Sequence, residues 1–198
     1  MKLNYRRTFF VGLAFLSICA FWQMYDNVIP LILKNTFHLG ETWTGVVMAM
    51  DNVLALMLLP LFGMLSDKLR TPLGRRTPFI LVGTVLAVIC MILLPVMDNA
   101  GSLTGFFIAL GAVLLSMGFC RSPAVALMPD LTPKPLRSKA NAVINLMGAL
   151  GGIFTLVMIS VLVPKTGRPD YMPLFLSVAA VMVVAVVALL LTIRENRM

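Results

Sequence analysis

The chain has 198 residues, of which 60% are apolar and only 12% are charged. Soluble domains carry about 25% charged residues, and one soluble core of this size could not bury so much apolar surface. Composition therefore excludes a soluble enzyme and a disordered chain, and indicates an integral membrane protein in contact with the lipid bilayer. The net charge of +8 comes from short basic clusters between apolar runs, a pattern that orients membrane proteins. We expect no nucleic-acid partner.

Six apolar stretches are long enough to cross a membrane, which takes about 20 helical residues. Each must be a helix, because in lipid a segment has to satisfy its own backbone hydrogen bonds. Membrane strands would alternate apolar and polar residues, and the apolar runs do not. We expect an all-α membrane protein with a single six-helix bundle over residues 1–198. Its helices are predicted at about 8–33, 43–65, 78–97, 103–127, 141–163 and 172–193.

The basic residues of the predicted connections are unevenly distributed. The connections on one side carry 12 Lys and Arg and those on the other side carry 3, while Arg121 lies within a span. The positive-inside rule places the richer side in the cytoplasm, so both termini are expected there. The short N-terminus and tight loops favour a multi-pass protein of the plasma membrane, with a bacterial inner membrane preferred.

A polar cluster interrupts the first span. Trp22 and Asp26 share one helical face, and Gln23 and Asn27 share the adjoining face. An aromatic ring beside carboxylate and amide groups suits a polyhydroxylated ligand, because the ring stacks on it and the polar groups bond its hydroxyls. An interfacial aromatic belt is the alternative interpretation, but it fits Trp43, at the head of the second span, better than Trp22 near mid-span.

Three charged side chains fall inside the predicted spans: Asp26, Asp51 and Arg121. Each costs about 2.5–3.5 kcal/mol at the centre of a helix that faces lipid, so we expect them to face one another, a neighbouring helix or water. Asn52 follows Asp51 directly. A carboxylate holds its proton more tightly in a dry cavity and less tightly near an arginine, which gives a physical basis for proton coupling. A static buried ion pair is the alternative.

Other features of the spans are read as structural. Asn141, Asn145, Gly148 and Gly152 recur on one face of the fifth predicted helix, and the two glycines form a small-residue packing motif. The sequence has no metal-ligand spacing, no nucleophile elbow and no phosphate loop. We expect no metal, no cofactor other than a coupling ion, and no enzymatic activity.

The loop after the second span, residues 63–79, reads GMLSDKLRTPLGRRTPF. It resembles the signature between helices two and three of the major facilitator superfamily, through Gly63, Asp67, Lys68, Gly74, Arg75 and Arg76. The insertion before Gly74 and the Pro78-Phe79 pair resemble the sucrose/proton symporter and glycoside–cation symporter branch. The segment 121–132, with Asp130 near its end and Arg137 downstream, is similar to the fourth-helix motif of that branch.

The resemblance implies a transporter of about twelve helices in two halves, with substrate bound between the halves near the midplane. This chain, which ends after six predicted spans, would be the N-terminal half, built from two inverted three-helix repeats. The implied partners are a second six-helix half and a small-molecule substrate, expected to be a sugar or glycoside that moves with H⁺ by alternating access.

The resemblance also implies roles for individual residues. Asp67 and Arg75 would form a cytoplasmic clamp that locks against the other half, and Arg121 would contact the sugar or a coupling carboxylate. Asp26 and Asp51 lie on helices where related symporters keep such acids. A solvated basic loop that only sets topology is the alternative to the clamp.

Two other functions stay open at this point. The chain could be a truncated six-helix remnant that does not transport and aggregates through its uncovered faces. It could also be a homodimeric transporter that uses a second copy as the missing half. Parallel pairing is allowed, because the two halves of such transporters are related by an axis along the membrane normal. The clamp argues against a homodimer, since its partner helix belongs to a different half.

Overall fold

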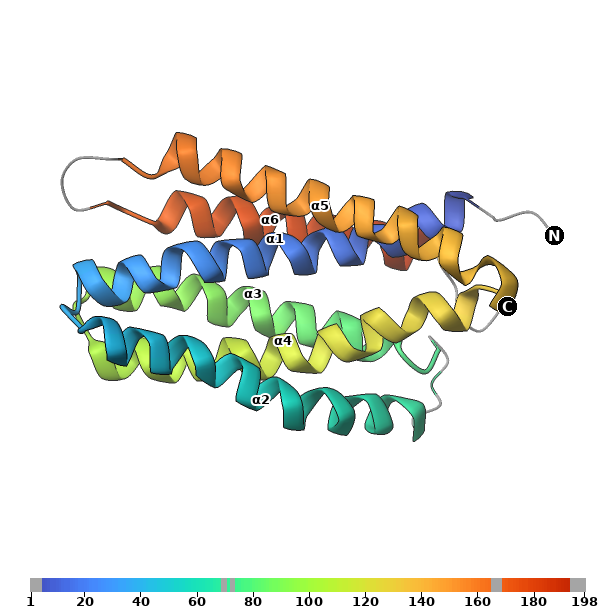
Figure 1. The fold of residues 1–198 in the computed structure, drawn as a ribbon, viewed down its shortest axis with the longest axis horizontal. Helices are drawn as coiled ribbons and strands as arrows, with labels where there is room; N and C mark the ends of the chain where they lie inside the picture. Colours follow the sequence, from blue (N-terminus) through green and yellow to red (C-terminus); the bar gives the residue numbers. More distant parts are fainter. Residues whose placement is uncertain (1–4, 69–70, 72–73, 165–168, 193–198) are drawn as a thin grey trace.

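The computed structural model describes residues 5–68, 71, 74–164 and 169–192, without the side chain of Arg6. Within these residues the chain forms six long helices and a short 3-10 turn, which confirms the predicted all-α class (Figure 1). All six long helices are apolar enough to cross a membrane. They are α1 (Tyr5–Asn35), α2 (Glu41–Lys68), α3 (Thr77–Asn99), α4 (Leu103–Leu131), α5 (Arg137–Leu162) and α6 (Met172–Thr192), with η1 (Lys134–Leu136) before α5.

Several helices run past the predicted apolar spans, because helical hydrogen bonding continues where the chain leaves the hydrocarbon. Local sequence fixes some of the starts. Ser102 caps α4, with its hydroxyl accepting a hydrogen bond from the Gly105 N–H at 3.3 Å, as N-cap serines do. Pro78 lies in the first turn of α3, where its missing N–H costs nothing.

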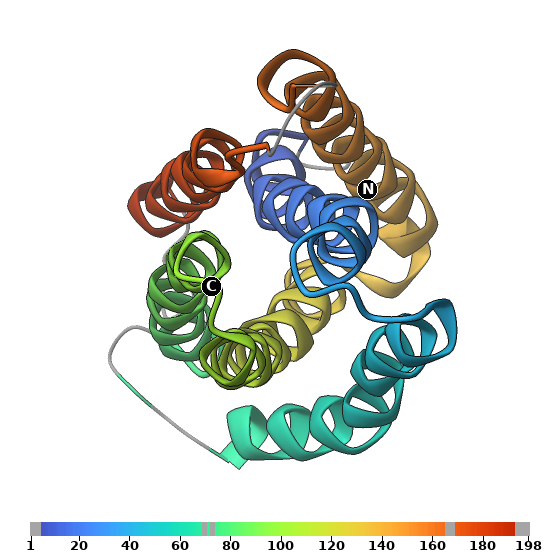
Figure 2. The same cartoon turned by 90° about the vertical axis from the view of Figure 1, so that its left-hand side faces the viewer.

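Helices α1 and α4 occupy the middle of the bundle. Helix α1 packs mainly against α5 and α6, whereas α4 packs against α3 and α2, and α3 also contacts α6. Figure 2, seen along the bundle, shows α5 and α2 at opposite edges with α1 and α4 between them. The largest fully buried side chains are aromatic or aliphatic and come chiefly from α1, α3, α4 and α6; among them are Phe21, Tyr25, Phe106, Tyr171 and Phe175.

Small residues let α1 and α5 approach closely. A Cβ on Gly151 would lie 2.2 Å from the Leu16 carbonyl oxygen, and one on Gly148 would lie 2.9 Å from the Cys19 Sγ. The Thr155 hydroxyl donates to the Ala20 carbonyl at 3.0 Å. Lipid gives no hydrophobic drive for helix association, so such close packing and interhelical bonds hold the pair together.

The prediction for the packing face of α5 is confirmed at Gly148 and wrong at Asn141, Asn145 and Gly152. A Cβ on Gly152 would meet only the Gln23 Oε1 at 3.5 Å, an ordinary contact, and Asn141 and Asn145 are exposed. Gly151, one residue from the predicted position, makes the closest approach. The difference arises because the backbone of α1 crosses α5 beside residue 151, and a one-residue step turns a helix by about 100°.

Two helices keep broad apolar faces uncovered within the described residues. Only Thr44, Val47 and Ser66 of α2 are buried. The exposed apolar side chains of α2 include Val53, Leu56, Met57 and Leu61, and those of α5 include Leu146, Ile153 and Val161. Surfaces of this kind are stable against acyl chains or against another apolar protein surface.

Candidate functional site

The membrane interior holds a cluster of Trp22, Asp51 and Arg121, which we call the membrane cluster. The guanidinium carbon of Arg121, on α4, lies 5.1 Å from the centroid of the Trp22 ring, on α1. This is a cation–π contact, which strengthens when it is desolvated. Asp51, on α2, joins these two residues around a hollow of about 10 Å³, which has room for about one water. The remaining lining is apolar.

The carboxylates of this region are near Arg121 without being bonded to it. Among the described residues, neither Asp26 nor Asp51 forms an ion pair with Arg121. Asp26 is exposed on α1, and its charge interacts with that of Asp51. Asp51 and Arg121 therefore share the hollow without forming the static ion pair of the alternative interpretation, and the functional roles of these charges stay predictions.

The three amide side chains that were predicted for the site have different neighbours. The Asn27 amide donates to the Gln23 carbonyl of its own helix at 2.7 Å. Gln23 lies beside Gly152 of α5, away from the contact that Trp22 makes with α4. Asn52 is exposed, and its side-chain amide donates to the Asp51 carboxylate at 2.9 Å. The four residues predicted on α1 therefore do not form one site.

Sequence reasoning missed Tyr25. Its ring meets the Trp22 ring edge-on, with 5.3 Å between the centroids, and 1% of the residue is exposed. Within the described part of the chain, neither the Tyr25 hydroxyl nor the Trp22 indole N–H has a hydrogen-bond partner. Buried polar groups are nearly always bonded, so these two donors are suited to a ligand. The signal in the sequence was the three-residue spacing between two amphipathic aromatic residues.

A second site, the charged cluster, consists of Ser66, Asp67, Arg76 and Asp130 where α2, α3 and α4 meet. Arg76 bonds to Asp67 with Nη2 at 2.9 Å from Oδ1, and its Nε donates to the Asp130 carboxylate. Its Nη1 reaches the Ser66 hydroxyl at 3.4 Å. Only 9% of the Arg76 side chain is exposed, against 58% for that of Asp67. One buried guanidinium therefore connects two helix ends.

Among the described residues, Asp67 pairs with Arg76 and forms no ion pair with Arg75; the clamp role that the resemblance implies for Arg75 stays a prediction. Gly74 has a φ of 116°, and its N–H donates to the Thr71 carbonyl at 3.0 Å, so the chain turns just before the two arginines. Adjacent residues at such a turn point in different directions. Arg76 is thereby buried against Asp130, while Arg75 is exposed.

Two further motif residues have structural partners. A Cβ on Gly63 would lie 3.1 Å from the Ser122 hydroxyl, which donates to the Leu59 carbonyl at 2.8 Å; Gly63 therefore permits α2 to pack on α4. Arg137 donates to the Pro129 and Thr132 carbonyls at 2.8 and 3.3 Å, so it caps the end of α4, where a cation is favoured. Lys68 is exposed.

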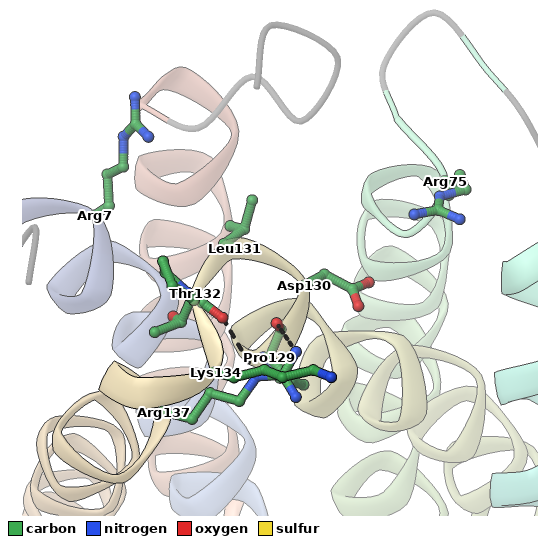
Figure 3. Close-up of a pocket in the computed structure, with 9 residues that line it drawn as sticks. Arg7, Arg75, Pro129, Asp130, Leu131, Thr132, Lys134 and Arg137 are labelled. Carbon is green, nitrogen blue, oxygen red and sulfur yellow. Dashed lines mark hydrogen bonds between the residues drawn. The ribbon is translucent and has the colours of Figure 1, made fainter. Parts of the chain in front are cut away.

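A pocket of about 560 Å³ opens beside the charged cluster (Figure 3). Its lining is rich in cations and combines the start of α1, the residue before Arg76 and the link from α4 to α5. The lining residues are Arg7, Arg75, Pro129, Asp130, Leu131, Thr132, Pro133, Lys134 and Arg137. Arg7 and Lys134 were not predicted to act together, because they are far apart in the sequence. The described residues contain no group of three or more His, Cys, Asp or Glu that could hold a metal.

Comparison with known proteins agrees with this architecture. The chain is 28% identical to the sucrose transport protein SUC3 of Arabidopsis thaliana over 137 residues, which cover 60% of this chain and 23% of the relative. It is 28% identical to the sucrose transport protein SUT3 of Oryza sativa subsp. indica, with 60% of this chain and 27% of the relative covered. The match thus spans about a quarter of the length of these relatives. The family model of the Major Facilitator Superfamily matches residues 11–197. The chain belongs to the Major Facilitator Superfamily.

Proposed function

We propose that the chain is the six-helix half of a proton-coupled sugar symporter that works by alternating access with a second six-helix half. The observation that carries this proposal is the membrane cluster, in which Arg121 stacks on Trp22 beside Asp51. Family membership and the likeness to sucrose transport proteins support it. We further propose that the protein lies in the plasma membrane with both ends of the chain in the cytoplasm, on the side whose connections carry most of the Lys and Arg residues.

The membrane cluster has the groups that a sugar requires. The Trp22 ring offers a face for stacking, and its indole N–H and the Tyr25 hydroxyl are donors without partners among the described residues. Arg121 presents a guanidinium with five N–H donors. The hollow of about 10 Å³ is far smaller than a ligand pocket, which takes about 300–1,000 Å³. Binding therefore requires α2 to move away from α1 and α4, or a surface from the second half to complete the site.

For the proposed proton coupling, the residues that we assign are Asp51 and Arg121. The two side chains line one hollow, and within the described part of the chain no ion pair joins them. An arginine lowers the proton affinity of a carboxylate that approaches it. We propose that helix movements which close and open this gap are coupled to the movement of H⁺. Asp26, exposed on α1 within the electrostatic range of Asp51, would pass the proton to or from water.

The charged cluster would serve as the gate. Arg76 connects the ends of α2 and α4 through two carboxylates, and most of the Asp67 side chain remains exposed. Asp67 can therefore also contact the second half. A set of charged bonds that forms in one state and breaks in another is a suitable two-state latch.

The test is uptake of labelled sucrose into vesicles that contain the chain together with its second half, with and without an imposed pH gradient. We expect the gradient to drive accumulation, Asp51→Asn to abolish accumulation while allowing exchange, and Arg121→Ala to abolish both. Glu41→Gln is the matched control, because Glu41 pairs with Lys34 at the opposite end of α2 from the gate. Sucrose accumulation that ignores the pH gradient, or normal uptake by both cluster variants, would remove these residues from the mechanism.

A further inference from the structure

The pocket beside the charged cluster lies at the level where the transmembrane helices end. Its walls come from the first turns of α1, the turn before α3, and the chain from the end of α4 to the start of α5. Arg7 and Arg75 lie on opposite sides, with Asp130, Lys134 and Arg137 between them (Figure 3). The volume of about 560 Å³ falls in the range of small-ligand sites, about 300–1,000 Å³.

The charge of the lining is strongly positive. Arg7, Arg75, Lys134 and Arg137 provide four cationic groups, and Asp130 provides the one carboxylate. That carboxylate is bonded to Arg76, which it shares with Asp67; with four cations against one carboxylate, the lining keeps a net positive charge. Among the described residues, neither Arg75 nor Lys134 forms an ion pair. Arg75 and Lys134 therefore keep their charges available to an anion that enters the pocket.

The pocket is also preorganised. Two carbonyl bonds, to Pro129 and Thr132, hold the Arg137 guanidinium in place and leave further N–H donors, since arginine carries five. Lys134 sits in the short 3-10 turn η1, which the Leu136 N–H closes by donating to the Pro133 carbonyl at 2.9 Å. Fixed arginine donors match the oxygens of phosphate groups, and a nearby lysine adds a point charge.

We propose that this pocket binds a phosphate group, either the headgroup of an anionic phospholipid or a soluble phosphate ester. The site is separate from the membrane cluster, and its ligand need not be the transported substrate. Both sources share the chemistry that the pocket recognises: a compact anion that accepts several hydrogen bonds. Basic pockets where transmembrane helices reach the headgroup region are suited to phospholipid headgroups.

The lipid arm of the test measures retention of dioleoyl phosphatidylglycerol or dioleoyl phosphatidylcholine on the detergent-purified chain by native mass spectrometry. We expect phosphatidylglycerol to be retained preferentially. Lys134→Gln and Arg75→Gln should each weaken its binding about fivefold. Lys139→Gln is the matched control, because Lys139 is an exposed cation of α5 that does not line the pocket; it should leave the binding unchanged.

The soluble arm uses glycerol 3-phosphate and inorganic phosphate as competitors. If either displaces phosphatidylglycerol, or binds alone with the same sensitivity to Lys134→Gln, the phosphate group is the recognised feature and a soluble ester is an admissible source. If phosphatidylglycerol binds and neither competitor displaces it, the source is lipid. Equal retention of the two lipids without phosphate binding overturns the proposal, as does an equal loss of binding in Lys134→Gln and Lys139→Gln. Thermal unfolding of each variant verifies that it is folded.

Discussion

The Arg121 guanidinium lies over the Trp22 ring, 5.1 Å from its centroid, and so joins α4 to α1 in the middle of the bundle. This contact gives an intramembrane arginine an electrostatic partner that is not a carboxylate. Asp51 therefore remains next to Arg121 without being consumed in an ion pair. The arrangement leaves the Asp51 carboxylate free for the coupling role proposed above, which a fixed salt bridge would prevent.

If the membrane cluster binds a sugar as proposed, substitution of Trp22 should weaken sugar affinity in proportion to the stacking surface that is lost. We expect Trp22→Phe to raise the KM of sucrose uptake about threefold and Trp22→Leu to raise it about tenfold or more, because each change removes stacking surface and also weakens the contact that positions Arg121, a cation–π contact of about 0.5–2 kcal/mol. Initial rates of uptake in vesicles measure the effect. The other tryptophan, Trp43, is 66% exposed at the start of α2, so Trp43→Phe should leave KM unchanged. An equal rise in both phenylalanine variants would contradict the assignment.

The two adjacent arginines of the loop should differ sharply in their effect on stability. Arg76→Gln leaves Asp67 and Asp130 without their shared partner. We expect it to lower the free energy of unfolding by about 2 kcal/mol, between the values for surface and buried ion pairs. Arg75→Gln removes the same charge from an exposed position and should cost about 0.5 kcal/mol or less. Thermal unfolding in detergent compares the two variants; equal losses would argue against Arg76 as the connecting residue.

Neighbouring glycines of α5 should respond in opposite ways to alanine. Gly151→Ala puts a methyl group 2.2 Å from the Leu16 carbonyl oxygen, so α1 and α5 must separate, and we expect a loss of about 1–3 kcal/mol. Gly152→Ala meets only the Gln23 side chain at 3.5 Å, and the higher helix propensity of alanine should leave stability unchanged or raise it by up to about 1 kcal/mol. Unfolding midpoints in one detergent test both. A tolerated Gly151→Ala would show that the helices do not cross here.

High pH should destabilise the protein partly through Tyr171, which lies just before α6. Burial, with a smaller contribution from Asp98, raises the pKa of the Tyr171 hydroxyl, and a hydrogen bond with the Asn35 side chain opposes this rise. Tyrosine becomes charged when it loses its proton, near pH 10 in an unfolded chain. Above that pH the unfolded state binds fewer protons than the folded state, so the free energy of unfolding falls as pH rises.

Tyr171→Phe should remove part of that fall. Between about pH 9 and 11.5, the melting temperatures of the wild type and the variant should both fall below their values at neutral pH. The melting temperature of the variant should fall less. Between about pH 6 and 8 the hydroxyl stays protonated in both states, and the two curves should run parallel. Parallel curves at high pH as well would show that Tyr171 does not carry the effect.

Much of the fold was determined by local sequence. The six helices follow from the length and apolarity of the stretches between polar connections, because lipid forces each to satisfy its own hydrogen bonds. The loop around Gly74 and the segment from Arg121 to Asp130 were sufficient to place the chain in its family, which the family model confirms over residues 11–197.

Local sequence did not determine the contacts between helices. Helical periodicity put Gln23 and Trp22 on adjoining faces of one cluster, and the family resemblance implied a clamp of Asp67 and Arg75. Only the packing of α1 between α4 and α5 separates the first two residues, and only the turn at Gly74 buries Arg76 in place of Arg75. The phosphate pocket depends on Arg7 and Lys134, which distant segments bring to one end of the bundle. Sequence spacing reports which residues share a helix face; which neighbour that face meets is decided by the relative rotation and crossing of whole helices, and that emerges only when all six pack together.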